Sequence, residues 1–131
     1  MNATFYHTSI NVSDIEFYKR LLDRLGFKIV AEYEHGFGAS DGTVSVWVFH
    51  VHPDYRQHPF HRKALGLNHL AFRVGSKDAV DTFYNEYLLA NKIPILYGGP
   101  AEYPEYEPGY YAVYFEDPDR LKLEVVYKPD R

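Results

Sequence analysis

The sequence contains no cysteine among its 131 residues. This absence excludes a disulfide scaffold, a thiolate nucleophile and any zinc or iron–sulfur site with cysteine ligands. A nucleophile or metal ligand must therefore come from histidine, aspartate, glutamate, tyrosine, serine or threonine.

Long apolar runs and long basic runs are also missing. No segment approaches the roughly 18 consecutive apolar residues that a membrane span requires, and the first residues lack the basic start and apolar core of a secretory signal. The formal net charge is -4, and no run of lysine and arginine exceeds two residues, which disfavours binding to a phosphate backbone. We therefore expect a cytoplasmic protein whose partners include neither a membrane nor a nucleic acid.

Aromatic residues are abundant. They make up 18% of the chain, with 13 tyrosines, while hydrophobic residues reach 46%. That apolar content is enough for a single domain over residues 1–131 with one core. The tyrosine excess predicts that some tyrosines line a pocket or an interface; the plainer alternative is tyrosine on a sheet surface.

An internal repeat organises the chain. The segment HTSINV, which begins at His7, returns 62 residues later (69 - 7) as HLAFRV, which begins at His69. Each copy is followed by an amphipathic helical pattern and then by short alternating strands. We therefore predict an α+β fold of two tandem βαβββ modules, residues 1–54 and 67–131, joined by a polar linker at residues 55–66.

Local signals set the expected element boundaries. Ser13 and Glu16 spell a capping box for the first helix, which Gly26 would end, and Ser76 caps a second helix that runs to Asn91. Strands are expected at residues 27–34, 43–51, 93–97, 110–116 and 120–127. The segment from Gly98 to Gly109 is interpreted as a proline-rich loop, either a lid over a ligand or a solvated acidic loop.

Strand alternation places three candidate metal ligands on one face. Side chains of opposite parity to His7, His69 and Glu124 are mostly apolar and would be covered by the helices. Two imidazoles and one carboxylate suit Fe, Mn, Ni or Zn. The alternatives are hydrogen-bonded histidines of no catalytic role and an ion pair of Glu124 with Lys122 or Arg73.

Three segments, HTSINVSDIEFYKRLLDRLGF, GLNHLAFRV and PGYYAVYFEDPDRLKLEVVY, together resemble the vicinal oxygen chelate superfamily of glyoxalases, bleomycin resistance proteins and extradiol dioxygenases. The resemblance implies an open, cleft-shaped mixed sheet with helices on the outer face and one divalent metal ion held by His7, His69 and Glu124. It also implies a small-molecule substrate chelated through vicinal oxygens, and a homodimer. With an offset of 76, Glu124 corresponds to Val48 (124 - 76), which disfavours true glyoxalase I activity because that enzyme uses a carboxylate there.

A general base is expected from one of three residues, His50, Tyr110 or Tyr111. His50 shares the parity of Val48, so a local bulge would be needed to bring it near the metal. The family's Asp-Pro-Asp-Gly turn has Arg120 in place of glycine, which predicts strain or a different turn type.

Several functions stay open at this point. The metal-dependent possibilities are a lyase or isomerase, an extradiol-type dioxygenase, and a thiol transferase of the fosfomycin-resistance type. The alternative class is a non-catalytic, ligand-sequestering protein like those that confer bleomycin resistance. Histidines 50, 52, 58 and 61 form a further cluster in the sequence, either a local metal site or surface residues of the linker.

Overall fold

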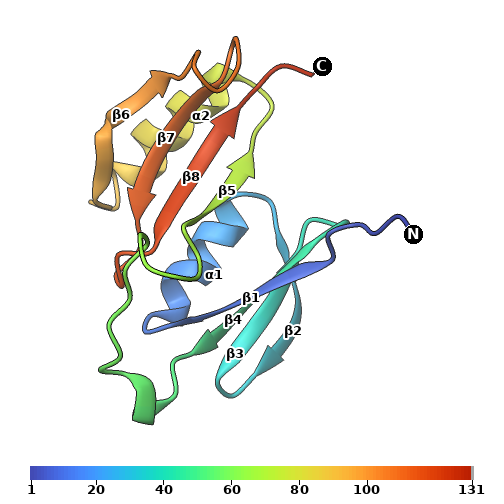
Figure 1. The fold of residues 1–131 in the computed structure, drawn as a ribbon, viewed down its shortest axis with the longest axis vertical. Coiled ribbons are helices and arrows are strands. Elements are labelled where there is room, and N and C mark those ends of the chain that lie inside the picture. The colour runs from blue at the N-terminus through green and yellow to red at the C-terminus, as the bar shows by residue number, and fades with distance from the viewer. Residues whose placement is uncertain (131) are drawn as a thin grey trace. The chain divides into compact units, whose positions relative to one another are not determined.

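The computed structural model describes residues 1–130, which form two compact units that divide between Pro59 and Phe60 (Figure 1). This division lies within residues 55–66, where the polar linker was expected. Each unit contains one four-stranded mixed sheet with one principal helix.

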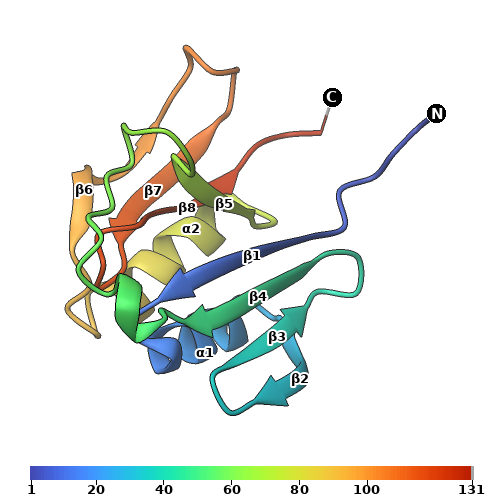
Figure 2. The same cartoon turned by 60° about the horizontal axis from the view of Figure 1, so that its bottom comes forward.

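The first unit has the order strand, helix, three strands. Its sheet runs β1-β4-β3-β2, with β1 parallel to β4 and the other pairs antiparallel. Helix α1 packs against one face of this sheet (Figure 2). The elements are β1 (His7–Val12), α1 (Ile15–Arg24), β2 (Lys28–Tyr33), β3 (Gly36–Ser40), β4 (Ser45–His50) and a 3₁₀ turn (Pro53–Tyr55).

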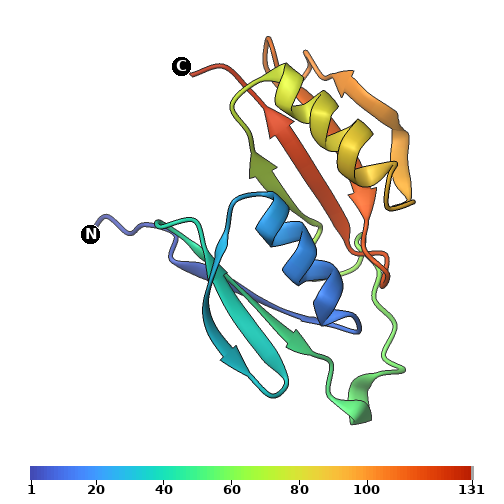
Figure 3. The same ribbon diagram turned by 180° about the vertical axis from the view of Figure 1, so that it is seen from behind.

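The second unit repeats that order. Its sheet runs β5-β8-β7-β6, with β5 parallel to β8, and α2 covers the face of β7 and β8 (Figure 3). The elements are β5 (His69–Arg73), α2 (Lys77–Phe83), a π-helical turn (Tyr84–Leu88), β6 (Ile95–Glu102), β7 (Tyr111–Glu116) and β8 (Lys122–Tyr127). The predicted α+β fold of two βαβββ modules with open mixed sheets is confirmed.

Capping explains where the helices begin. The prediction of Ser13 as the first N-cap is wrong by one residue, because the Asp14 carboxylate accepts the Phe17 N–H at 3.1 Å. The Ser76 cap is confirmed, since its hydroxyl accepts the Ala79 N–H at 3.0 Å. The second helical segment ends at Leu88 rather than Asn91. No helix among residues 1–130 is long and apolar enough to cross a membrane.

Two strands differ from the sequence-based expectation. Strand β3, with the sequence GFGAS, was not located because its two glycines break the alternating pattern. A Cβ at Gly38 would lie 2.5 Å from the Trp47 ring, so this close approach requires glycine. Strand β6 extends to Glu102 with a register shift between Leu96 and Ala101, and so takes the first residues of the expected Gly98–Gly109 loop.

The turns that precede β4 and β8 differ in length by one residue. In the first unit the Asp41 N–H donates to the carbonyl of Val44, whereas in the second the Asp117 N–H donates to the carbonyl of Leu121. The extra residue is accommodated at Arg120, whose φ of 67° lies in the left-handed region. The turn therefore survives without glycine and carries local backbone strain.

We expect Arg120→Gly to be more stable than Arg120→Ala by about 1 kcal/mol, because only glycine relieves the positive φ. Both variants lose the exposed contact of Arg120 Nε with Glu116 Oε2 at 3.4 Å, so that contact cancels in the comparison. Urea unfolding of the two variants measures the difference. An alanine variant as stable as the glycine variant would show that the turn is unstrained.

Candidate functional site

A buried carboxylate defines the chemical face of the second unit. The side chain of Glu124 is only 1% exposed, although it lies on a strand between Leu123 and Val125. Those two neighbours point toward α2, so Glu124 points to the opposite face of the sheet. Its Oε1 lies 3.1 Å from Nε2 of His69, and its Oε2 accepts a short hydrogen bond from the Tyr110 hydroxyl.

The orientation of the His69 ring is fixed from its other side. Nδ1 lies 2.7 Å from Oδ1 of Asn68, whose amide nitrogen donates to the carbonyl of Arg62 at 3.5 Å. We therefore assign the proton of neutral His69 to Nδ1, which leaves a lone pair on Nε2 directed at Glu124. Two acceptors at that distance need a proton or a cation between them.

The spacing of these two acceptor atoms fits a shared metal ion. Zinc-like ions bind nitrogen and oxygen ligands at about 2.0–2.2 Å, which places neighbouring ligand atoms about 3.0–3.5 Å apart in octahedral or tetrahedral geometry. The observed separation of 3.1 Å lies within that interval. His69 and Glu124 are therefore suited to act as two ligands of one cation.

His7, the third predicted ligand, belongs to the first unit. It is exposed on β1, whereas Ile10 and Val12, which point to the opposite face of the strand, are buried, as strand alternation predicts. Its ring lies 6.4 Å from that of Trp47. The structure thus brings His69 and Glu124 together within one unit. Within residues 1–130 it shows no group of three histidine, aspartate or glutamate side chains arranged to hold a metal.

An aromatic hollow of ≈ 540 Å³ surrounds His7 on its side of the first sheet. Tyr33 stacks on Trp47 at its wall, with ring centroids 6.3 Å apart and planes 26° from parallel. The hollow is lined by Tyr6, His7, Ser9, Tyr33, Trp47 and Phe49. This surface can accommodate a flat, apolar part of a small molecule next to the histidine.

The residue that corresponds to Glu124 in the first unit is Trp47, not Val48. Ser9 pairs with Trp47 in the parallel β1–β4 ladder, just as Ala71 pairs with Glu124 in β5–β8. The expected offset of 76 is therefore wrong by one, because the turn before β8 is one residue longer. The conclusion that this position lacks a ligand still holds, since an indole cannot coordinate a metal as a carboxylate does.

His50, the first candidate base, lies on the other face of its sheet. It shares the parity of the buried Val46 and Val48, and β4 pairs without a register shift from Ser45 to His50. The bulge that would turn His50 toward the face of His7 is therefore absent from this strand. Its ring lines a separate hollow of ≈ 490 Å³ together with His35, Val51, His52, Pro53 and Arg56.

Tyr110 lies on the same face as Glu124. Burial first, and then the hydrogen bond to Glu124, raise the pKa of Tyr110 well above its usual value. A phenol with a raised pKa keeps its proton at neutral pH, so Tyr110 acts as a hydrogen-bond donor to the carboxylate rather than as a base.

Tyr111, one residue further along, faces α2 instead. Its hydroxyl donates to Oδ1 of Asp81 at 2.6 Å. This hydrogen bond, followed by burial, raises the pKa of Tyr111 to about 12. Tyr111 therefore anchors the helix to the sheet, on the side away from Glu124.

The sequence analysis missed a set of tyrosines around Glu124, here called the tyrosine cluster. Tyr114 lies opposite Glu124 in the β7–β8 ladder, and its ring centroid is 6.1 Å from that of His69. Burial and then the charge of Glu124 raise the pKa of Tyr114. The cluster consists of Tyr97, Tyr103, Tyr106, Tyr110 and Tyr114.

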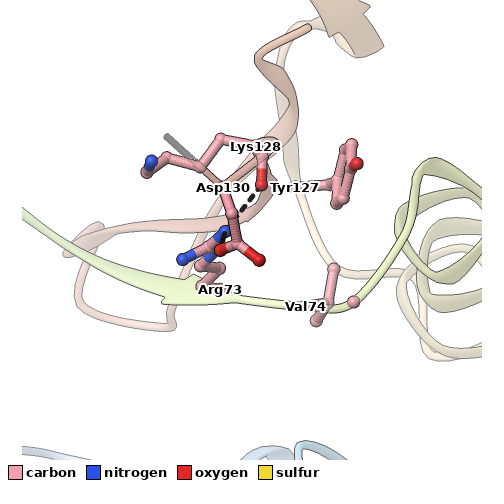
Figure 4. A pocket seen from close by; sticks show the side chains of 6 residues that line it. Arg73, Val74, Tyr127, Lys128 and Asp130 are labelled. Carbon is pink, nitrogen blue, oxygen red and sulfur yellow. Dashed lines mark hydrogen bonds and ion pairs between the residues drawn. The ribbon is translucent and has the colours of Figure 1, made fainter.

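The alternative ion-pair partners of Glu124 are engaged elsewhere. Arg73 donates from Nη2 to the carbonyl of Lys128 and to Oδ1 of Asp130, both at 2.8 Å (Figure 4). Lys122 places its ammonium over tyrosine rings. His69, Tyr110 and Tyr114 are therefore the polar partners of Glu124.

The model of the glyoxalase/bleomycin resistance protein/dioxygenase superfamily matches residues 4–125. The chain belongs to this superfamily.

Individual relatives agree with that membership. The uncharacterized Bacillus subtilis (strain 168) protein YqjT is 33% identical over 125 residues, covering 92% of this chain and 96% of that protein. A crystal structure of a Bacillus halodurans protein, provisionally described as a glyoxalase, is also 33% identical, with a TM-score of 0.83 and 95% of each chain covered.

A more distant superfamily structure shares the fold alone. The fosfomycin resistance protein FosX from Listeria monocytogenes is 18% identical, with a TM-score of 0.70, and 98% of this chain and 96% of that chain are covered. The duplicated module of this superfamily thus accounts for both units of the chain.

Removal of the Tyr110 hydroxyl should destabilise the protein. We expect Tyr110→Phe to lower the free energy of unfolding by about 1.5–3 kcal/mol, because a buried charged acceptor loses a donor. Tyr106→Phe is the matched control: it lies in the same tyrosine cluster and is 61% exposed, so we expect a change within about 0.5 kcal/mol. Chemical denaturation measures both, and equal effects would contradict the assigned role of Tyr110.

The raised pKa of Tyr111 predicts that the free energy of unfolding falls at alkaline pH. Its pKa is about 12 in the folded chain and about 10 when unfolded, so its contribution is complete below pH 10 and disappears as the pH rises through 12. Tyr111→Phe should therefore lose less stability than the wild type between pH 10 and 12. Denaturation midpoints across this interval measure the effect, and parallel curves would refute it.

Proposed function

We propose that this protein is a divalent-metal-dependent enzyme that acts on a small molecule with vicinal oxygens, through a site of His7, His69 and Glu124. The observation that carries the proposal is the buried contact between Nε2 of His69 and Oε1 of Glu124. These two atoms are 3.1 Å apart, and the Glu124 side chain is almost fully buried. A cation bound between them would compensate the cost of placing two acceptors so close together.

The residues of the chain would divide the work. Asn68 holds the His69 ring in its ligating orientation, and Tyr110 holds the second oxygen of Glu124. The tyrosine cluster limits the access of water and lowers the local polarity. When bound, the metal would act as a Lewis acid on substrate oxygens, and two imidazoles with one carboxylate suit Fe, Mn, Ni or Zn.

Trp47 narrows the choice among family activities. In glyoxalase I the corresponding position carries a carboxylate that ligates the metal and transfers the substrate proton, whereas here the position holds an indole. We therefore place the activity with other members: a lyase or isomerase, an extradiol-type dioxygenase, or a thiol transferase of the fosfomycin-resistance type. The general base would then be a group of the substrate or a residue other than Tyr110. Tyr110 is not suited to that role because its raised pKa keeps its hydroxyl protonated.

The second candidate is a ligand-sequestering protein. The aromatic hollow beside His7 favours it, because stacked Tyr33 and Trp47 rings can hold a flat ligand without any chemistry. In that case the histidines and Glu124 would have no metal to hold. For either candidate, we predict from the sequence that the protein is a homodimer and is located in the cytoplasm.

Metal content separates the two candidates. Untagged wild-type protein should retain a stoichiometric divalent ion, while His7→Ala, His69→Ala and Glu124→Gln should each lose it, because each removes a third of the protein ligands. Elemental analysis of the purified proteins measures the outcome. His58→Ala, which removes an exposed histidine of the linker, should keep the metal.

A spectroscopic readout is available for the same variants. Trp47 is the single tryptophan of the chain and lies 6.4 Å from His7, so Co²⁺ or Ni²⁺ bound at His7 should quench its fluorescence. His7→Ala should abolish this quenching, and His58→Ala should preserve it. A wild type that is purified without metal, and whose fluorescence is not quenched when Co²⁺ or Ni²⁺ is added, would favour the sequestering protein.

A further inference from the structure

Lys122 occupies an unusual position beside the candidate metal ligands. It pairs with His69 across the parallel β5–β8 ladder, and it precedes Glu124 by two residues on the same strand face. Its ammonium lies over the rings of Tyr97 and Tyr114, 4.9 Å from each ring centroid. The positive charge is therefore held at the tyrosine cluster, next to the site.

No carboxylate among residues 1–130 forms an ion pair with this ammonium. The nearest candidate in the ladder is Glu116, which lies opposite Lys122 but binds Arg62 Nη1 at 2.7 Å and Arg120 Nε at 3.4 Å. Glu124 is committed to His69 and Tyr110. Lys122 thus keeps an uncompensated charge in a half-buried location, where an anion would be bound favourably.

The other lysines that contact aromatic rings differ in this respect. Lys19 lies over the Phe37 ring and also pairs with Glu32, and Lys77 lies over the Tyr111 ring and also pairs with Glu102. In those two places the carboxylate explains the position of the lysine. At Lys122 the described part of the chain provides two tyrosine rings but no carboxylate partner.

We infer that Lys122 binds an oxyanion of the substrate, so that the substrate is an acidic small molecule with a carboxylate or a phosphonate near its chelating oxygens. The part of this inference that concerns the chelating oxygens rests on the proposed function. The binding of an oxyanion by Lys122 does not depend on it. An ammonium over two ring faces is fixed in place before binding, which lowers the entropy lost on association.

The overall charge makes this assignment specific. With a formal net charge of -4, the chain as a whole repels anions, so the general field would not favour an acidic ligand. A preference for such a ligand would therefore require a local cation. Lys122 is a local cation on the face that carries His69 and Glu124.

Paired ligands test the inference on metal-loaded protein. Catechol, 3,4-dihydroxybenzoate and 3,4-dihydroxyphenylphosphonate share the same two vicinal oxygens, and only the last two carry the oxyanion. By calorimetry, we expect Lys122→Met to lower the preference of the wild type for the acidic ligands over catechol by about tenfold. Lys122→Arg should retain the preference, and the better acidic ligand identifies the oxyanion.

Anion binding by Lys122 is also measured in metal-free protein, so that the result does not depend on whether the proposed metal site binds a metal. Benzoate and phenylphosphonate are titrated against neutral benzamide and followed by amide chemical shifts. We expect the two anions to shift residues around Lys122 in the wild type and not in Lys122→Met. Lys77→Met is the matched control, because it removes a lysine over a tyrosine ring on the helix side.

The outcomes separate the two proposals. An anion preference that Lys122→Met removes, in protein that binds no metal, supports the oxyanion site and refutes the proposed enzyme. Equal binding of acidic and neutral ligands by wild type and Lys122→Met, in both metal states, overturns the inference and leaves Lys122 as a packing residue. If Lys122→Met fails to fold, Lys122→Gln replaces it. Equal binding of acidic and neutral ligands by the wild type would overturn the inference without any variant.

Discussion

A charged carboxylate buried in the central region of a sheet is the constraint on which the second unit depends. Glu124 is 1% exposed, and an isolated carboxylate in such a place would be strongly destabilising. The surrounding sheet supplies partners from three directions: His69 from the parallel strand, the hydroxyl of Tyr110 from the residue that precedes β7, and the ring of Tyr114 from the antiparallel strand. The chemical character of this face follows from the need to satisfy that carboxylate.

The two units use the same fold for different purposes. In each, a helix covers one face of the sheet and leaves the other face to the side chains of opposite parity. The second unit places an acid there, together with His69 and a ring of tyrosines. The first places Trp47 at the equivalent position and builds an aromatic hollow around His7. The face opposite the helix therefore carries a carboxylate and a histidine in the second unit and an aromatic hollow around His7 in the first.

The tyrosine cluster links packing to electrostatics. Three of its rings, those of Tyr103, Tyr110 and Tyr114, pack with Ala112 and Val126 beside Glu124, and the pKa values of these three tyrosines rise mainly because they are buried. A less polar surrounding also strengthens the interaction of any charge placed there. The ammonium of Lys122 lies against this environment over the rings of Tyr97 and Tyr114, and no carboxylate of residues 1–130 forms an ion pair with it.

The sequence by itself determined the duplicated βαβββ order, the face of its own sheet on which each of His7, His69 and Glu124 lies, and the kinds of ligand available. These features depend on local periodicity, because alternation along a strand and apolar spacing along a helix are written in neighbouring residues. Only the tertiary structure decided that Trp47 rather than Val48 corresponds to Glu124, since strand register depends on a turn that is longer by one residue. It also separated Tyr110 from Tyr111 and placed Tyr114 and Lys122 beside His69, because such neighbours come from cross-strand pairing, which no single segment of sequence encodes.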